Sequence, residues 1–156
     1  METISQRNYS YQAAGRFWLV PELYLTRMPD GTLAIMQDEI DRIHRAIANE
    51  ICGSPDSLTS DELEFLCDVT LTSFTEVAES LDVHKSTLTK WRKSLAHLLP
   101  WTSLLLKKRF WFKIFGDQLR NQIVRFEQVE DDATFLAFAR NQAIEEELAV
   151  PIRKSA

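Results

Sequence analysis

The sequence predicts a mainly α-helical fold with a short N-terminal β-hairpin and a C-terminal helical extension. Three observations predict it: apolar residues recur at helical spacing after residue 37, polar caps precede several of these segments, and β-favouring runs flank a turn signal near the N-terminus. With 156 residues, 45% of them hydrophobic, the chain can bury one core. We expect an N-terminal arm, hairpin and helix over residues 1–57, a helical domain over 58–125 and the extension over 126–156.

The N-terminal region begins with a polar segment and continues into a hairpin. Residues 1 to about 16 show no regular pattern apart from Tyr9 and Tyr11, and we expect them to form a mobile or loosely docked arm. Between Phe17 and Met36, β-favouring runs lie on both sides of Pro29-Asp30-Gly31, a combination that marks a turn. The pattern therefore predicts a short hairpin over residues 17–36.

An amphipathic helix is predicted to follow the hairpin. Asp38 is available to cap its first turn, and Gly53 with Pro55 ends it. Its apolar face is formed by Ile40, Ile43, Ile47 and Ile51. His44 lies beside this face without a second metal ligand, so we expect it to be a packing or surface residue.

Two capping boxes mark the helices that come next. Thr59 is followed three residues later by Glu62, and Ser73 by Glu76, the spacing at which each side chain bonds the other residue's backbone amide. A further helix is predicted to run through Leu88, Trp91 and Leu95 until Pro100 breaks it.

The chain after Pro100 is predicted to hold two more helical segments. The first, from Ser103 to about Arg125, is both apolar and basic, with Gly116 as a candidate break. The second ends in the acidic cluster Glu145-Glu146-Glu147. Its apolar residues are Phe135, Leu136, Phe138, Ala139 and Ile144.

Charge is distributed unevenly along the chain, whose formal net charge is −5. The segment from His84 to Arg125 holds ten Lys or Arg against the single acid Asp117, a net charge of +9. The remaining residues hold eight Lys or Arg against 22 Asp or Glu, a net charge of −14. This asymmetry indicates that one part of the protein faces an anion.

Composition argues against several classes of protein and site. Cys52 and Cys67 are far apart and have no histidine pair nearby, so we expect reduced cysteines and neither a disulfide nor a zinc site. The four glycines form no phosphate-binding loop and the three histidines are scattered, so we expect no enzyme activity and no cofactor. Since the sequence has no signal-peptide core and no run of ~18 apolar residues, we expect a soluble, cytoplasmic protein.

The segment Ser73 to Ser94, SFTEVAESLDVHKSTLTKWRKS, has the pattern of two short helices joined by a tight turn. Ala78 must be small where the helices cross, Leu81 and Val83 fill the turn, and Leu88 and Trp91 anchor the second helix to the core. The residues left on the outward face of the second helix are His84, Lys85, Ser86, Thr89, Lys90 and Lys93. A face of this kind fits the DNA major groove.

This segment resembles the helix-turn-helix of the Xre or lambda-repressor-like family, whose pattern is roughly S-Q-x-x-L-A-x-x-L-G-V-S-x-x-T-I-S-x-W-E. The matching positions are Ser73, Ala78, Leu81, Val83, Thr87 and Trp91, with Val77, Leu88 and Thr89 as conservative variants. The departures are Phe74 for Gln, Asp82 for Gly, His84 for Ser and Arg92 for Glu. Asp tolerates the left-handed turn conformation better than most residues, so Asp82 is compatible with the motif.

Residues upstream of the motif carry a second resemblance, which covers about Tyr11 to Trp91. They are Tyr11, Gly15, Leu23-Tyr24-Leu25, Pro29-Asp30-Gly31, residues 43–48, Leu58-Thr59, Glu62-Leu63 and Phe65-Leu66. Their order is similar to that in the helix-turn-helix half of MqsA-type antitoxins and related regulators. The zinc-binding CxxC module of that family is absent from this sequence. The resemblance implies a dimeric DNA-binding protein.

The outward face of the second motif helix is the candidate DNA-reading surface. The family comparison implies that Lys85, Ser86 and Lys90 read bases, with His84 and Thr89 beside them. The residues expected to contact phosphates are Lys93, Lys107, Lys108 and Arg109, and Ser73 belongs to the same DNA-binding set. The predicted function is that of a homodimeric transcriptional repressor at a palindromic operator.

Other functions stay open at this point. The chain could be an antitoxin or adaptor that mainly holds a protein partner through its N- or C-terminal segment, with DNA binding serving autoregulation. Its helix-turn-helix could also pack against protein, or belong to a recombinase accessory or terminase-like subunit. The aromatic residues among the basic ones could stack on single-stranded bases, although a core or dimer interface is the expected role of Trp101, Phe110, Trp111, Phe112 and Phe115.

Overall fold

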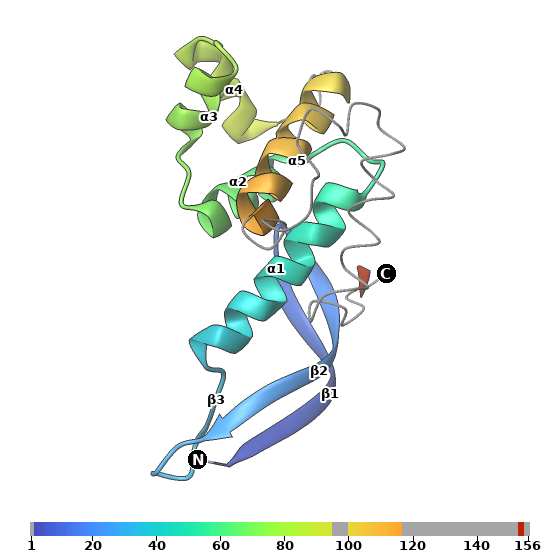
Figure 1. Cartoon of the computed structure of the whole chain (residues 1–156), viewed down its shortest axis with the longest axis vertical. Coiled ribbons are helices and arrows are strands. Elements are labelled where there is room, and N and C mark those ends of the chain that lie inside the picture. The colour runs from blue at the N-terminus through green and yellow to red at the C-terminus, as the bar shows by residue number, and fades with distance from the viewer. Residues whose placement is uncertain (1, 95–99, 117–152, 155–156) are drawn as a thin grey trace.

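The computed structural model describes residues 2–94, 100–116 and 153–154. Within these residues the chain is mainly helical with a small antiparallel sheet near its N-terminus, which confirms the coarse fold class. Figure 1 shows an elongated molecule with strands at one end and most of the helices at the other. The long elements are β1 (Thr3–Ala13), β2 (Arg16–Arg27), α1 (Gln37–Gly53), α2 (Ser60–Thr70), α3 (Phe74–Ser80), α4 (Lys85–Lys93) and α5 (Pro100–Phe115).

Strands β1 and β2 form a long antiparallel hairpin, in which Thr3 pairs with Thr26 and Ala13 with Arg16. The two turn residues, Ala14 at φ 53° and Gly15 at φ 77°, have the left-handed conformation of a primed hairpin turn. A Cβ atom at Gly15 would collide with the carboxylate of Asp61, so glycine allows the turn to approach α2 closely. The arm predicted over residues 1–16 is therefore wrong, because residues 3–13 form a strand.

Strand β1 has a weak sequence pattern, which is why it was not predicted. Its four half-buried residues are Ile4, Tyr9, Tyr11 and Ala13, and the other seven are exposed. Asn8 has φ 55°, and the pairs on either side of it place it opposite Pro21, which has no N–H to donate. Pairing with β2, more than any apolar alternation of its own, makes this segment a strand.

The Pro29-Asp30-Gly31 turn reverses the chain as predicted, but it leads into a strand of only two residues, β3 (Leu33–Ala34). Asp30 Oδ1 accepts hydrogen bonds from Thr32 N at 3.0 Å and Thr32 Oγ1 at 2.6 Å. The described sheet has the order β1-β2-β3, and β4 (Arg153–Lys154) also pairs with β2. The main partner of β2 is thus the preceding strand and not the segment after the turn.

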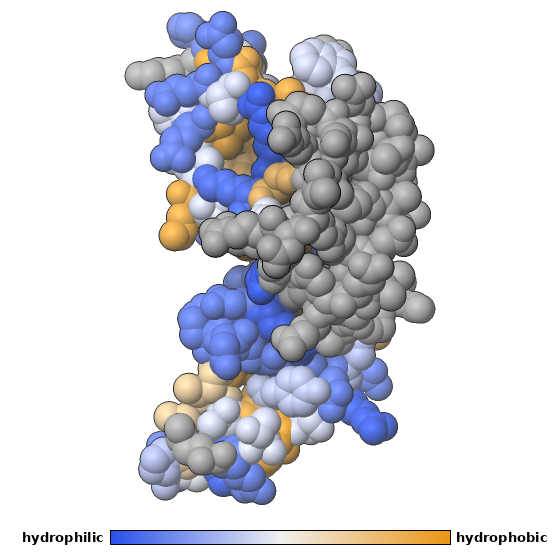
Figure 2. Space-filling view, in the orientation of Figure 1, coloured by the Kyte–Doolittle hydropathy of each residue, from blue (hydrophilic) through white to orange (hydrophobic). Residues whose placement is uncertain are grey.

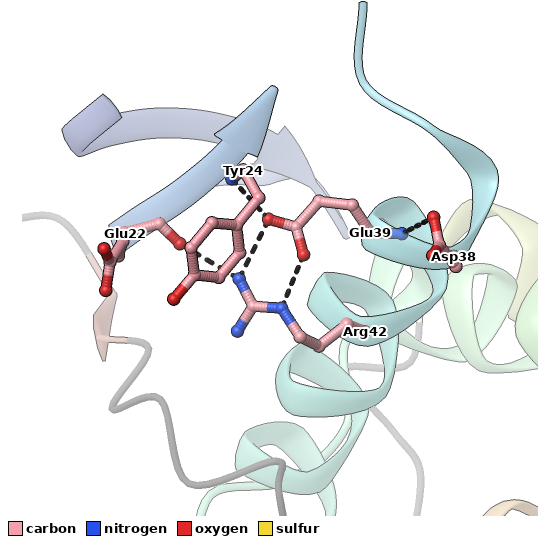
Figure 3. A network of polar contacts seen from close by, with 5 residues as sticks. All are labelled: Glu22, Tyr24, Asp38, Glu39 and Arg42. Carbon is pink, nitrogen blue, oxygen red and sulfur yellow. Dashed lines mark hydrogen bonds and ion pairs between the residues drawn. The ribbon is translucent and has the colours of Figure 1, made fainter. Parts of the chain in front are cut away.

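Side chains of α1 occupy the edge of β2 between its β3 and β4 pairings (Figure 3). Tyr24 N–H donates to Glu39 Oε2 at 2.6 Å, and Arg42 Nη2 donates to the Glu22 carbonyl at 2.9 Å. Glu39 also holds Arg42, with Oε1 at 2.5 Å from Nε. Glu39 and Arg42 thus give the Tyr24 N–H and the Glu22 carbonyl the hydrogen-bond partners that a neighbouring strand would otherwise provide. Since Glu39 is buried, its ion pair with Arg42 also fixes α1 on β2.

A second contact ties β1 to the helices. Tyr11 Oη lies 2.7 Å from His44 Nε2, and the His44 ring meets Phe65 of α2 edge-on, with ring centroids 5.3 Å apart. Burial lowers the pKa of His44, which favours the neutral ring. His44 is therefore a packing residue, one of the two roles predicted for it.

The core lies where α1, α2 and α5 pack together. Ile43, Ile47 and Ile51 are buried as predicted. The N-cap residue of α1 is Met36 and not Asp38, but Asp38 Oδ1 accepts the Glu39 N–H at 3.0 Å in the first turn. The fully buried Trp111 of α5 donates from Nε1 to Asn49 Oδ1 of α1 at 2.9 Å. The Thr59–Glu62 capping box is present at the start of α2. No helix in the described part of the chain has the length and apolar character needed to cross a membrane.

Helix α5 differs at both ends from the helix predicted after Pro100. Pro100 is its first residue. Proline fits this position, because the first N–H of a helix makes no intrahelical hydrogen bond and its absence costs nothing. The helix ends at Phe115, directly before the candidate break Gly116. The rest of the segment predicted to reach Arg125, as well as Leu95 and the C-terminal segment from Phe135 to Glu147, lies outside the described residues.

Replacing Glu39 with Ala is expected to lower the free energy of unfolding by about 2–4 kcal/mol, because the change leaves the Arg42 guanidinium without its buried partner. Chemical denaturation measures this. Glu50→Ala is the matched control, since Glu50 is an exposed acid on the same helix. Equal effects of the two substitutions would show that the edge contact contributes nothing specific.

Candidate nucleic-acid interface

Helices α3 and α4 form the two-helix unit predicted from the sequence. Ser73 caps α3 by accepting the Glu76 N–H at 3.1 Å, which is one of the two bonds of the predicted capping box; the cap of α3 lacks the reciprocal bond to the Glu76 side chain. The turn places Asp82 at φ 55°, the left-handed conformation expected where the family pattern has glycine. Val83 N–H then donates to the Ala78 carbonyl at 3.0 Å, which closes the turn over the small residue predicted at the crossing.

The unit is anchored to the core through its inner face. Val77, Ala78 and Trp91 are buried, as the motif requires. Ser60 Oγ of α2 donates to the Trp91 carbonyl at 3.0 Å, and so it connects the start of α2 with the last turns of α4. These contacts orient the opposite face of α4 toward solvent.

The start of α4 uses His84 as its cap. His84 Nδ1 accepts the Ser86 N–H at 3.2 Å and lies 3.0 Å from Ser86 Oγ. Because Nδ1 is engaged in capping, only Nε2 of this exposed ring is left to meet another molecule. Lys85 is the first residue of the helix.

The solvent face of α4 collects most of the predicted reading residues. Ser86, Thr89, Lys90 and Lys93 are all exposed. They lie on a helix that Figure 1 places, together with α3, at the end of the molecule opposite the N-terminus. The structure thus brings these hydroxyl and ammonium groups together on one accessible surface.

Charge differs in sign between the two helices. The exposed acids Glu76, Glu79 and Asp82 lie on α3 and in the turn, whereas Lys90, Arg92 and Lys93 occupy the last turn of α4. An anion that approaches this end of the molecule is therefore attracted to α4 and repelled by the exposed side of α3.

The phosphate role predicted for Lys107 and Lys108 is wrong, because both residues are buried in α5, with exposed fractions of 3% and 7%. Lys107 Nζ donates to the carbonyls of Ser54 and Asp56, which follow the C-terminus of α1. The ammonium group there supplies a donor to two carbonyls of the loop after α1, near the negative end of the helix dipole. Arg109 is exposed, and its Nη1 donates to the Ser80 carbonyl at 3.0 Å at the end of α3.

Two contacts of the unit were not foreseen from the sequence. The Arg92 guanidinium lies 5.3 Å from the centre of the Phe74 ring, so two departures from the family pattern pack against each other. Lys113 Nζ of α5 donates to Thr72 Oγ1, just before α3. The sequence held a signal for the first contact, because Phe74 replaces the glutamine of the family pattern and Arg92 replaces its glutamate.

The two cysteines and the metal-ligating side chains can be assessed among the residues that the structure describes. Burial raises the pKa of Cys52 to about 12 and that of Cys67 to about 11, so both thiols stay protonated. Within the described ranges, no group of three His, Cys, Asp or Glu side chains could hold a metal ion.

Comparison of the chain with protein-family models, with curated proteins and with solved structures finds no match. A function for this chain must therefore follow from its own residues and their geometry.

Replacing Lys107 with Met should lower the free energy of unfolding by about 1–3 kcal/mol, because two carbonyls are then left without their donor. Lys90→Met, at an exposed position of α4, should change it by less than ~0.5 kcal/mol. Thermal and urea unfolding of both variants measure the difference. A Lys107 variant as stable as the parent would contradict the structural role.

Proposed function

We propose that the chain binds double-stranded DNA sequence-specifically, with α4 in the major groove, and that it acts as a dimeric transcriptional repressor. The observation that carries this proposal is the exposed, hydroxyl- and lysine-bearing face of α4, held outward by a motif whose inner face is buried. A major groove about 12 Å wide accepts one helix and presents a distinct hydrogen-bonding pattern for each base pair.

Base contacts are assigned to the residues near the start and middle of α4. Ser86, Thr89 and Lys90 carry the groups that can meet base edges, with His84 Nε2 and Lys85 beside them. The lysines are suited to the acceptors of guanine, and the hydroxyls can bond several bases.

Phosphate contacts are assigned to Lys93 and Arg109, with Ser73 at the start of α3. Arg109 uses Nη1 to bond the Ser80 carbonyl, so the other nitrogens of its guanidinium can contact a phosphate. Lys107 and Lys108 have no part in this assignment, since their burial removes them from the surface.

The dimeric state follows from the limited surface of a single motif. One small module buries about 600–1,000 Å² on DNA, and two copies on a palindrome combine their contacts. The resemblance to Xre-type regulators and to the DNA-binding half of MqsA-type antitoxins supports the same arrangement.

Selection of bound duplexes from a random DNA pool tests the function directly. The expected result is enrichment of a palindromic site whose half-sites lie about one helical turn, or a multiple of it, apart. If no sequence is enriched while the purified protein is folded, DNA reading by α4 is wrong, and the adaptor function would become the better explanation.

Lys90→Ala should weaken binding to the selected site by about 1–3 kcal/mol and relax the preference at particular base pairs. Binding titrations on the selected site and on its single-base variants measure this. Glu64→Ala, an exposed change on α2, is the control. A Lys90 variant that keeps the full base preference would remove this residue from the reading surface.

Lys93→Ala should instead weaken binding to all sequences alike. The plot of log K against log salt should also become shallower by about one unit, because the variant no longer neutralises one phosphate. Titrations at several salt concentrations, on specific and random duplexes, test this. A weakening confined to the selected site would mean that Lys93 reads a base.

A further inference from the structure

A cleft of about 800 Å³ lies between α1, the end of α2 and the end of α5, away from α4. Figure 2 shows the surface hollowed between the part of the molecule that carries α1 and the part that carries α2 and α3. Its apolar lining is formed by Ala13, Phe65, Val69, Leu71 and Ile114. No residue of α4 lines it, so occupation of the cleft leaves the proposed DNA-reading face accessible.

Leu71, at the C-cap of α2, has two unfavourable properties. Its φ of 54° lies in the left-handed region, where glycine or asparagine is usual at the end of a helix. Its exposed fraction is 91%, the largest among the exposed large hydrophobic residues that the structure describes. Neither property stabilises the isolated chain, and together they leave an almost fully exposed apolar side chain at the edge of the cleft.

Charged groups of both signs surround the apolar lining. Asp41 and Arg45 come from α1, Asp68 from α2 and Lys113 from α5. Within the described part of the chain, no ion pair joins any two of these four groups. Asp41 Oδ1 accepts a hydrogen bond from Gln37 Nε2 at 2.8 Å. Arg45 lies over the Phe115 ring at 5.7 Å, and Lys113 bonds the Thr72 hydroxyl.

We propose that this cleft is the interface with a second copy of the chain, and that Leu71 of each copy enters the cleft of the other. In a two-fold interface the same surface serves both copies, so it must be complementary to itself. The cleft meets this condition, because it offers an apolar projection beside an apolar hollow, and two carboxylates beside two cations. Asp68 of one copy is assigned to Lys113 of the other.

The second copy is favoured over other occupants by this balance of charge. A ligand or partner of strongly single-signed charge would be repelled by two of the four groups, whereas a second copy can place Asp68 against Lys113 twice, once on each side of the two-fold axis. The inference deepens the proposed function, on which it rests for the expectation of a dimer. Because the interface lies apart from α4, it can be tested without DNA.

Sedimentation equilibrium of the full chain, without DNA, tests the interface. The parent chain should dimerise, and Leu71→Glu should raise the dimer dissociation constant roughly tenfold or more, because an apolar anchor is replaced by a carboxylate. Leu33→Glu, at an exposed leucine on β3 that does not line the cleft, should leave the constant unchanged. A monomeric parent, or a Leu71→Glu variant that dimerises like the parent, would overturn the proposal. Circular dichroism verifies that each variant is folded.

Two charge reversals give an independent test. Asp68→Lys and Lys113→Asp should each weaken the homodimer, because like charges then meet across the two-fold axis. An equimolar mixture should form a heterodimer, since opposite charges then face each other again. A mixture no more associated than either variant alone would overturn the assigned pair. Enrichment of a DNA site is measured separately, so a failed interface and a failed DNA-binding function are distinguishable.

Discussion

The burial of α5 against α1 is the constraint on which the rest of the structure depends. The Trp111–Asn49 hydrogen bond fixes how α5 is positioned along α1. A buried indole N–H needs an acceptor, and a shift of one helix along the other would separate it from Asn49 Oδ1. From that register, Lys107 reaches the carbonyls after α1, and Ser103 Oγ accepts the Leu58 N–H at 2.9 Å. One helix thus holds the end of α1 and the start of the segment that leads to α2.

This constraint changes the meaning of the basic segment. A net charge of +9 over residues 84–125 resembles an electrostatic footprint on DNA, yet two of its lysines are buried inside the protein, where Lys107 satisfies backbone carbonyls. Composition records the sign of a charge but not its exposure. Fewer cations are therefore available to DNA than the net charge of the segment indicates. The exposed ones include Lys90 and Lys93 on α4, and Arg109, which bonds the end of α3.

The features that could be predicted from the sequence are the helix caps and turns, which depend only on neighbouring residues. The Thr59–Glu62 box, the Ser73 cap and the left-handed Asp82 each depend on a few adjacent residues, and each was predictable. The burial of Lys107 depends on Ser54 and Asp56, more than 50 residues earlier in the chain, which no local pattern reveals. Strand β1 depends on its pairing with β2, because its own residues show little apolar alternation. The left-handed conformation and the exposure of Leu71 were not predicted from the sequence.

Helix α5 also determines how the motif and the cleft are placed relative to each other. Arg109 bonds the Ser80 carbonyl at the end of α3, and Lys113 bonds the Thr72 hydroxyl before its start. Both ends of α3 are thus bonded to the helix that also lines the cleft, which couples the position of the α3–α4 unit to the cleft. An interface formed through the cleft would therefore fix the separation and orientation of the two α4 helices. Half-site spacing would then be a property of the α2–α3 corner at Leu71, remote from any residue that reads a base.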